Sequence, residues 1–181
     1  MILLVGIVAA IAVALLRGGS FKHLSNIQFR WAWLALAALT IQVVLIRLLP
    51  GWSAGARFLF PLTHLAILAV AWVNRSLRGM WLLAIGVALN LLVMVVNGGF
   101  MPVTPEGLVQ AGIAGSVESV RLYTRVGYSK SVVMPGDEIA LRWLSDTIAL
   151  RPIQTIVSLG DVLMVPGVFL IVEEAMLQQE D

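Results

Sequence analysis

The chain has 181 residues, of which 60% are apolar and only 12% are charged, and its formal net charge is +2. Soluble globular proteins carry about 25% charged residues, so this chain has too few charges to cover a soluble domain, and lipid must surround most of it. The thin spread of lysine and arginine argues against nucleic-acid binding. The absence of cysteine excludes disulfides, thiolate metal sites and a cysteine nucleophile.

Five apolar stretches predict five transmembrane helices. They are Met1–Leu16, Trp31–Leu49, Phe58–Val73, Gly79–Val96 and Pro152–Val172. Tryptophans lie near the ends of these stretches, as in the aromatic belts of membrane proteins. The first stretch has no basic segment before it, which favours a retained signal anchor over a cleaved signal peptide. The fold class that we predict is therefore an all-α membrane protein with five transmembrane helices.

The loop charges predict the orientation in the membrane. The two loops at 17–30 and 74–78 contain basic residues and no acid. By the positive-inside rule these loops are cytoplasmic, which places the N-terminus outside and the C-terminus inside. The chain then divides into a four-helix region (1–96), an extracytoplasmic segment (97–151), and a fifth helix with an acidic cytoplasmic tail (152–181).

The extracytoplasmic segment has local signals of structure. Thr104, Pro105 and Glu106 read as an N-cap, a proline at the first helical position and an acid in the first turn, so a short helix is expected from there toward Ala114. The residues 131–134 and 138–143, which flank Pro135 and Gly136, resemble two short strands around a turn. We therefore predict one short helix and one small hairpin.

Asp161 is the principal candidate for chemistry, because a carboxylate at membrane depth is expensive and is a functional-site candidate by default. In one interpretation it lies near the middle of an unbroken fifth helix and binds a proton, a cation or a polar head group. In another, Ser158, Gly160 and Pro166 break the span, and Asp161 caps a half-helix. A third is a buried pair with Arg47 or a hydrogen bond to His64.

Other polar residues have ordinary structural explanations. Asn97 and the two glycines that follow it can end the fourth helix, although such a turn could also cradle a phosphate or a quinone. His64 has no second histidine at ligand spacing, so no metal or haem site is predicted. No zinc-protease, nucleophile-elbow or phosphate-loop motif occurs. We therefore name no catalytic residue and no cofactor, and an enzyme is not the favoured function.

Three sequence blocks together carry a resemblance: Asn97–Glu106 (NGGFMPVTPE), Leu144–Ile148 (LSDTI) and Val157–Leu163 (VSLGDVL). They resemble a family of small multi-pass bacterial membrane proteins that is classified as a domain of unknown function. The resemblance implies a bacterial cytoplasmic (inner) membrane protein and transfers no activity. It points to Asn97, Asp146 and Asp161 as the residues to mutate first.

Two functions follow as hypotheses. The first is an accessory or scaffold subunit of a larger membrane complex, whose partners are membrane lipids and other membrane-protein subunits or further copies of itself. The second is a lipid-, quinone- or ion-binding site around Asp161, with Asn97, Asp146 and Arg142 at its mouth. An acid in such a site would have its pKa raised by desolvation.

Overall fold

The computed structural model describes residues 2–25, 28–48 and 53–177. In these ranges the chain is mostly helical. The α-helices are α1 (Ile2–Leu16), α2 (Ala32–Leu48), α3 (Ala54–Val73), α4 (Met80–Val96), α5 (Pro105–Gln110) and α6 (Leu159–Leu177). Four short strands are β1 (Met101–Val103), β2 (Ser131–Val133), β3 (Ile148–Leu150) and β4 (Thr155–Val157). Short 3-10 turns cover Phe21–Ser25, Val117–Ser119, Arg142–Leu144 and Arg151–Ile153.

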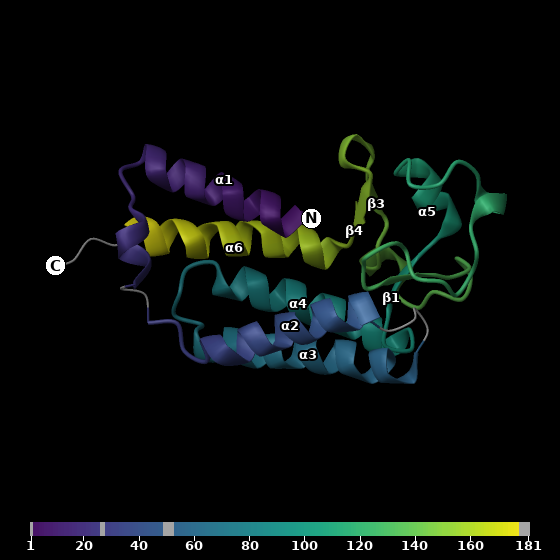
Figure 1. Cartoon of the computed structure of the whole chain (residues 1–181), viewed down its shortest axis with the longest axis horizontal. Coiled ribbons are helices and arrows are strands. Elements are labelled where there is room, and N and C mark those ends of the chain that lie inside the picture. The colour runs from purple at the N-terminus through teal and green to yellow at the C-terminus, as the bar shows by residue number, and fades with distance from the viewer. Residues whose placement is uncertain (1, 26–27, 49–52, 178–181) are drawn as a thin grey trace.

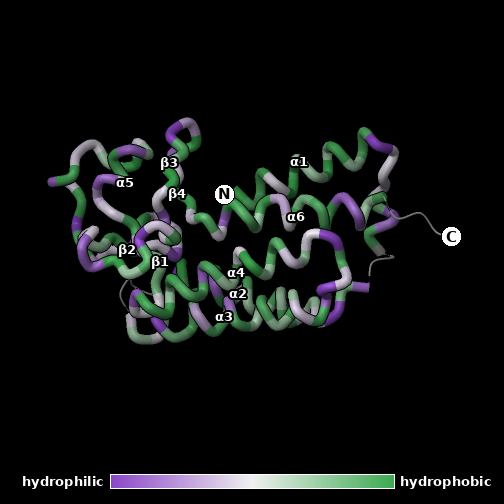
Figure 2. Tube along the Cα trace, turned by 180° about the vertical axis from the view of Figure 1, so that it is seen from behind, coloured by the Kyte–Doolittle hydropathy of each residue, from purple (hydrophilic) through white to green (hydrophobic). Residues whose placement is uncertain are grey.

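The five long helices run side by side, and the strands and α5 gather at one end of the bundle (Figure 1). α6 packs against both α4 and α1, while α3 packs against α2 and α4. α1 and α2, in contrast, do not pack against each other along their lengths. Hydrophobic residues dominate the helices, and hydrophilic ones concentrate toward the two ends of the bundle (Figure 2).

The structure has long helices over four of the apolar stretches with bounds close to those predicted. α1, α2 and α4 differ from the predicted ranges by no more than one residue at each end. α3 begins earlier, at Ala54 rather than Phe58, because Ser53 caps it by accepting a hydrogen bond from the Ala56 amide at 3.3 Å. The predicted ends at Met1 and Leu49 lie outside the described residues.

Helix length supports fewer membrane spans than the apolar stretches suggested. Among the described residues, only α3, with 20 residues, is both long and apolar enough to cross a membrane. α1, α2 and α4 are apolar but shorter, with 15, 17 and 17 residues. By length and composition, five transmembrane helices are therefore not established.

The predicted start of the fifth helix at Pro152 is wrong. Residues 151–153 form a 3-10 turn and residues 155–157 form β4, so α6 begins only at Leu159. β3 and β4 pair antiparallel as a hairpin, with Ile148 opposite Val157. The apolar residues that precede α6 therefore belong to a strand. This change moves Asp161 from the middle of a helix to its first turn.

The predicted hairpin at 131–143 is also wrong. β2 pairs in parallel with β1, which places Met101 opposite Ser131, and residues 142–144 form a 3-10 turn. The predicted short helix does exist as α5, and Thr104 caps it by accepting a hydrogen bond from the Gly107 amide at 3.1 Å. It ends at Gln110, before the expected Ala114.

The segment between α4 and α6 is held on the end of the bundle by a shared apolar core. This core combines residues from α2, α3 and α4 with residues from β1, β2 and the turn at 142–144; its members are Leu45, Ala56, Phe60, Val93, Met94, Phe100, Met101, Val132 and Leu144. Phe60 and Phe100 meet edge to face, with 6.3 Å between their ring centroids. The position of β2 on the helix ends is therefore fixed by packing.

Candidate functional site

The first turn of α6 is closed by a reciprocal pair of hydrogen bonds. The Asp161 amide donates to Ser158 Oγ at 3.0 Å, and the Ser158 amide donates to Asp161 Oδ2 at 3.3 Å. The Val162 amide donates to the Ser158 carbonyl, which marks Ser158 as the N-cap. Together these bonds form a capping box, in which the cap residue and the third helical residue satisfy each other's amide groups.

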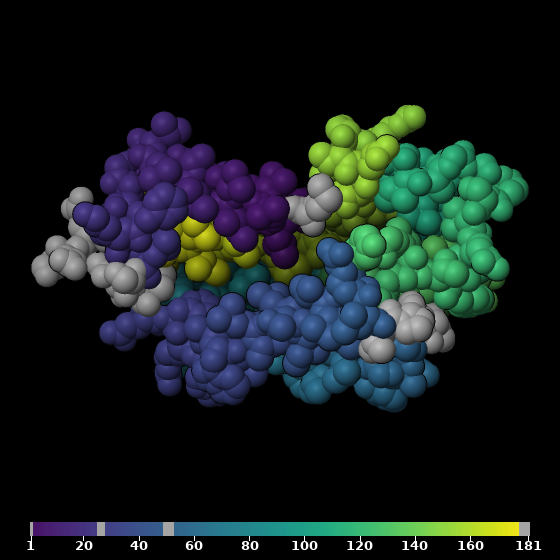
Figure 3. All heavy atoms as spheres, viewed as in Figure 1, coloured from purple at the N-terminus to yellow at the C-terminus, as the bar shows by residue number. Residues whose placement is uncertain are grey.

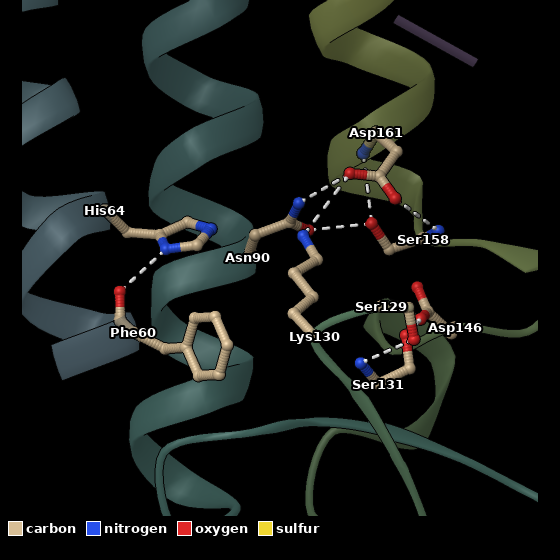
Figure 4. Close-up of polar contacts among 9 residues, drawn as sticks. All are labelled: Phe60, His64, Asn90, Ser129, Lys130, Ser131, Asp146, Ser158 and Asp161. Atoms are coloured by element: carbon tan, nitrogen blue, oxygen red, sulfur yellow. Dashed lines mark hydrogen bonds and ion pairs between the residues drawn. The ribbon is translucent and has the colours of Figure 1, made fainter. Parts of the chain in front are cut away.

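The other oxygen of the Asp161 carboxylate faces α4 and Lys130 (Figure 4). Lys130 belongs to the segment between α4 and α6, residues 97–158, which contains all four strands and is named the strand segment. Asn90 Nδ2 donates to Asp161 Oδ1 at 2.8 Å, and Ser158 Oγ donates to Asn90 Oδ1 at 2.7 Å. Lys130 Nζ lies 3.6 Å from Asp161 Oδ1. Asp161 therefore caps a helix and at the same time forms one half of an ion pair.

Asp146 lies beside this cluster and is only 5% exposed. Its Oδ2 accepts a hydrogen bond of 2.6 Å from Ser131 Oγ, whereas its Oδ1 is buried and has no hydrogen-bond partner among the described residues. Burial raises the pKa of Asp146 to about 7, although the positive charge of Lys130 opposes the increase. This carboxyl group therefore exchanges its proton close to neutral pH.

Polar groups on α3 face the cluster from the opposite side of the bundle. His64 Nδ1 lies 2.8 Å from the Phe60 carbonyl oxygen, which can only accept, so Nδ1 carries the hydrogen. The second nitrogen, Nε2, is on the side of the ring that faces Asn90 and Lys130 (Figure 4), and no described residue hydrogen-bonds to it. In neutral histidine this nitrogen is an acceptor.

A cavity of about 590 Å³ connects these groups. Its polar wall is formed by Gln42, His64, Ser129, Lys130, Ser131, Asp146, Thr155 and Asp161. Its remaining lining is apolar and comes from α1, α2, α3, α4 and α6, together with Phe29 and with Ile156 and Val157 of β4. A largely apolar cavity of 300–1,000 Å³ with a few converging polar groups is the usual form of a small-molecule site.

The structure brings two of the four predicted site residues together and leaves two elsewhere. Asp146 and Asp161 both line the cavity. Asn97 and Arg142 do not. Asn97 exchanges hydrogen bonds of 2.9 Å with the backbone of Ala140, and the Arg142 guanidinium lies against Gly136.

The turn after α4 ends the helix, with Asn97 as the C-cap. Asn97 has a φ of −112°, and the left-handed conformations belong to Gly98 and Gly99. A Cβ on Gly99 would lie only 1.8 Å from the Arg57 carbonyl oxygen. Gly99 is therefore required by the contact with α3, whereas Gly98 is favoured by its left-handed φ of 72°. The structure gives this turn a packing role.

The alternative partners suggested for Asp161 are not the ones it contacts. The Arg47 guanidinium lies over the ring of Tyr128, 4.4 Å from its centroid, and His64 bonds to the Phe60 carbonyl. The partners of Asp161 are Asn90, Lys130 and Ser158. Sequence reasoning missed the role of Lys130, because a lysine between two serines in a loop carries no signal of its own.

The chemistry available at this site is that of hydrogen bonding, charge and proton exchange. Within the described parts of the chain, no group of three or more histidine, aspartate and glutamate side chains is placed to hold a metal ion. The site has one lysine and two carboxylates against a long apolar wall. It can therefore hold a polar head group and cover the apolar body attached to it.

Comparison with known proteins places the chain in a family without assigning an activity. No curated protein matches it, and no solved structure matches it. A family described as a family of unknown function (DUF5317) matches residues 26–173. These residues include the whole of the candidate site apart from the wall contributed by α1. The chain belongs to this family of unknown function.

Proposed function

We propose that the protein is a multi-pass membrane protein that binds a membrane-soluble amphiphile in the cavity between its helices. The polar head of this ligand would lie at Lys130, Asp146 and Asp161, and its apolar part would lie along the helices. The observation that carries the proposal is the 590 Å³ cavity, whose polar wall contains an ion pair and whose remaining lining is mostly apolar.

The distribution of side chains supports a lipid environment for more helices than α3 alone. Large apolar side chains point outward on all of the first four helices; Leu4, Trp33, Leu36, Leu62 and Trp81 are between 53% and 69% exposed. In contrast, the polar side chains Thr63, His64, Asn90 and Ser158 are buried. A soluble monomer rarely exposes such large apolar surfaces, whereas polar residues that face the bundle interior are typical of membrane proteins.

The charges at the two ends of the bundle agree with a multi-pass arrangement. Arg17, Arg75 and Arg78 lie in the turns at one end, where Arg17 forms an ion pair with Glu173 and the Arg78 amide donates to Glu174. The strand segment lies at the opposite end (Figure 1). The short helices can be accommodated by local thinning of the bilayer. The proposed orientation has the N-terminus outside and the C-terminus inside the cytoplasmic membrane.

The test is native mass spectrometry of the protein extracted from its own membrane in a mild detergent. We expect the native protein to carry a small lipophilic molecule. Asp161→Asn keeps an acceptor for the Ser158 amide but removes the charge that faces Lys130, so this variant should fold and lose the ligand. Asp161→Leu removes the cap as well and should be unstable.

The matched control is Glu106→Gln, which neutralises an exposed carboxylate in α5 and should leave the bound molecule unchanged. If Asp161→Asn retained the full ligand content of the native protein, the charge of Asp161 would have no role in binding. A native protein that carries no small molecule, even after incubation with membrane lipids, would contradict the proposed function.

A second candidate is the accessory or scaffold subunit, because the exposed apolar faces of α1–α4 can meet another membrane protein as well as lipid. The same mass spectra distinguish the two. Co-purifying subunits at fixed stoichiometry without a bound small molecule would favour the accessory role. A monomer or homo-oligomer with a bound lipid would favour the ligand-binding protein.

A further inference from the structure

The cavity is polar at one end and apolar along the rest of its length, which fixes the direction of a bound amphiphile. Three helices contribute residues one turn apart to its wall. These are His64 and Ile67 in α3, Leu83 and Val87 in α4, and Met164 and Val168 in α6. The two residues of α6 follow Asp161 in the same helix. The rise from Asp161 to Val168 is about 10 Å at 1.5 Å per residue. The apolar part of the ligand therefore points away from the strand segment.

The charges at the polar end disfavour an anionic head group. One lysine faces two carboxylates, and Lys130 is already paired with Asp161 at 3.6 Å. A phosphate or carboxylate head would bring a further negative charge next to Asp146 and Asp161, and the described lining residues offer no lysine or arginine besides the already paired Lys130. Like charges in such a site oppose binding strongly.

The hydrogen-bonding groups at this end indicate what the head group must offer. His64 Nε2 is an acceptor in the neutral ring and has no donor among the described residues. The Lys130 ammonium has three N–H donors, more than its ion pair with Asp161 uses. A hydroxyl group can donate to His64 Nε2 and accept from the Lys130 ammonium. A ketone can do only the latter. An ammonium head would be attracted by the two carboxylates, but it has no lone pair to accept from Lys130 and would lie next to that positive charge.

A lateral opening leads from the side of the bundle to this cavity. α1 and α2 do not pack against each other along their lengths, and Figure 3 shows a furrow between them with α4 and α6 at its floor. Leu3 and Ile7 of α1 and Ala35 and Leu39 of α2 line the same cavity from the two sides of this furrow. All four side chains are apolar.

We infer that the ligand is a lipid with a neutral hydroxyl head group, and that it enters the cavity sideways from the bilayer between α1 and α2. This inference rests on the proposed function and specifies its ligand class and route. The head would bind between His64 and Lys130, beside the Asp146–Asp161 pair. The chain would lie against α3, α4 and α6.

The head group is tested with probes that share one alkyl chain. Hexadecanol, palmitate, hexadecyl phosphate and hexadecylamine are each titrated into the delipidated protein in detergent, and binding is measured by native mass spectrometry. We expect hexadecanol to bind at least about tenfold more tightly than the other three. His64→Leu should weaken hexadecanol binding by a similar factor, whereas Leu65→Val, at an exposed position of the same helix that does not line the cavity, should not.

The outcomes separate the inference from the proposed function. If palmitate, hexadecyl phosphate or hexadecylamine bound as tightly as hexadecanol or better, the neutral hydroxyl head would be wrong while an amphiphile site would remain. If none of the four probes bound, both the inference and the proposed function would fail. A variant that fails to fold would not affect the ranking of the probes on the native protein.

The route is tested by closing the furrow, and the absence of native cysteine makes this direct. Leu3→Cys and Leu39→Cys are combined and bridged with a bis-maleimide in lipid nanodiscs. The control pair is Val43→Cys with Leu62→Cys, which are exposed residues adjacent to the Gln42–Thr63 contact between α2 and α3. We expect the first bridge, and not the second, to slow hexadecanol exchange at least about tenfold. Equal exchange rates in both bridged proteins would exclude entry between α1 and α2.

Discussion

Ser158 and Asp161 show how one short motif can serve a helix and a site together. The Ser158 hydroxyl accepts from the Asp161 amide and donates to Asn90 Oδ1, and the Asp161 carboxylate receives bonds from Ser158 and Asn90. One oxygen of the carboxylate is thus used by the cap, and the other faces Lys130 and the cavity. The structural and functional interpretations of Asp161 are therefore compatible.

Asp146 should make the stability of the protein depend on pH. Its pKa rises from an ordinary value of 3.8 to about 7 because the group is buried, so the folded protein binds more protons than the unfolded chain between these two values. The free energy of unfolding must then fall as the pH rises through this window, by roughly 4 kcal/mol in total. Thermal unfolding in detergent at several pH values measures this slope.

Asp146→Asn should remove most of that slope, because an amide has no proton to exchange in this range while its oxygen can still accept from Ser131. The variant should therefore be more stable than the native protein above neutral pH. Asp137→Asn, at an exposed carboxylate, is the control and should leave the pH profile as it is. An unchanged slope in Asp146→Asn would show that Asp146 does not titrate differently in the folded protein.

At this scale the sequence singled out the two acids more readily than it predicted what they contact. Asp161 stood out because it interrupts an apolar stretch. Lys130 did not, because its contact with Asp161 joins a loop to a helix that begins 29 positions later in the chain, at Leu159. Asn97 and Arg142 were predicted at the mouth of the site, and the fold directs them to other contacts.

Among the elements, the α4–α6 pair positions the site, and it depends on two glycines at the crossing. A Cβ on Gly160 would lie 2.2 Å from Asn90 Oδ1 and 2.5 Å from the Gly86 carbonyl oxygen. Both distances are far shorter than a van der Waals contact, so α4 and α6 would have to move apart to accommodate the added atom. The close approach in turn allows Asn90 to reach Asp161 and Ser158.

Gly160→Ala should therefore destabilise the protein by about 1–3 kcal/mol or more, the usual range for an overfilled contact, and should weaken ligand binding by displacing Asn90. Gly115→Ala is the matched control, because a Cβ there would meet nothing within 4 Å. The melting temperatures of both variants in detergent measure the difference. A Gly160→Ala protein as stable as Gly115→Ala would mean that α4 and α6 do not cross so closely.

The elements that sequence patterns predicted well are those with local signals. Long apolar runs located α1, α2 and α4, and the Thr104-Pro105-Glu106 cap located α5. The strands were misplaced for two reasons. A short segment such as residues 153–157, in which Ile153, Ile156 and Val157 are apolar, does not distinguish a strand from the start of a helix. The pairing of β2 with β1 joins residues 30 positions apart, Met101 and Ser131, which no local pattern records.

For the whole molecule, the arrangement combines an apolar exterior, a polar interior and a site at the end that carries the strands. A protein that binds a bilayer lipid needs its head-group site near one membrane face and an apolar path from the bilayer to it. The location of Lys130, Asp146 and Asp161 at the strand end of the helices (Figure 4) and the furrow between α1 and α2 (Figure 3) provide both. The membrane orientation then decides which leaflet supplies the ligand.

That orientation can be measured by cysteine labelling, since the native chain has no cysteine. Ser119→Cys places a thiol in the strand segment, and Ser76→Cys places one in the turn between α3 and α4; both serines are exposed. In intact cells a membrane-impermeant maleimide should label the first variant and not the second, and permeabilised cells should label both. The physical reason is the excess of arginine and lysine in the turns at 17–30 and 74–78, which the positive-inside rule assigns to the cytoplasm.

The inverse pattern would reverse the orientation and place the head-group site at the cytoplasmic face, so that the ligand would come from the inner leaflet. Equal labelling of the two thiols in intact cells would mean that α4 and its neighbours do not separate them by a bilayer, and the multi-pass arrangement would be wrong. With the expected pattern, the site opens at the extracytoplasmic end. A lipid that reaches it through the α1–α2 furrow would then come from the outer leaflet, because Lys130 and Asp146 of the polar wall belong to the segment at that end of the bundle.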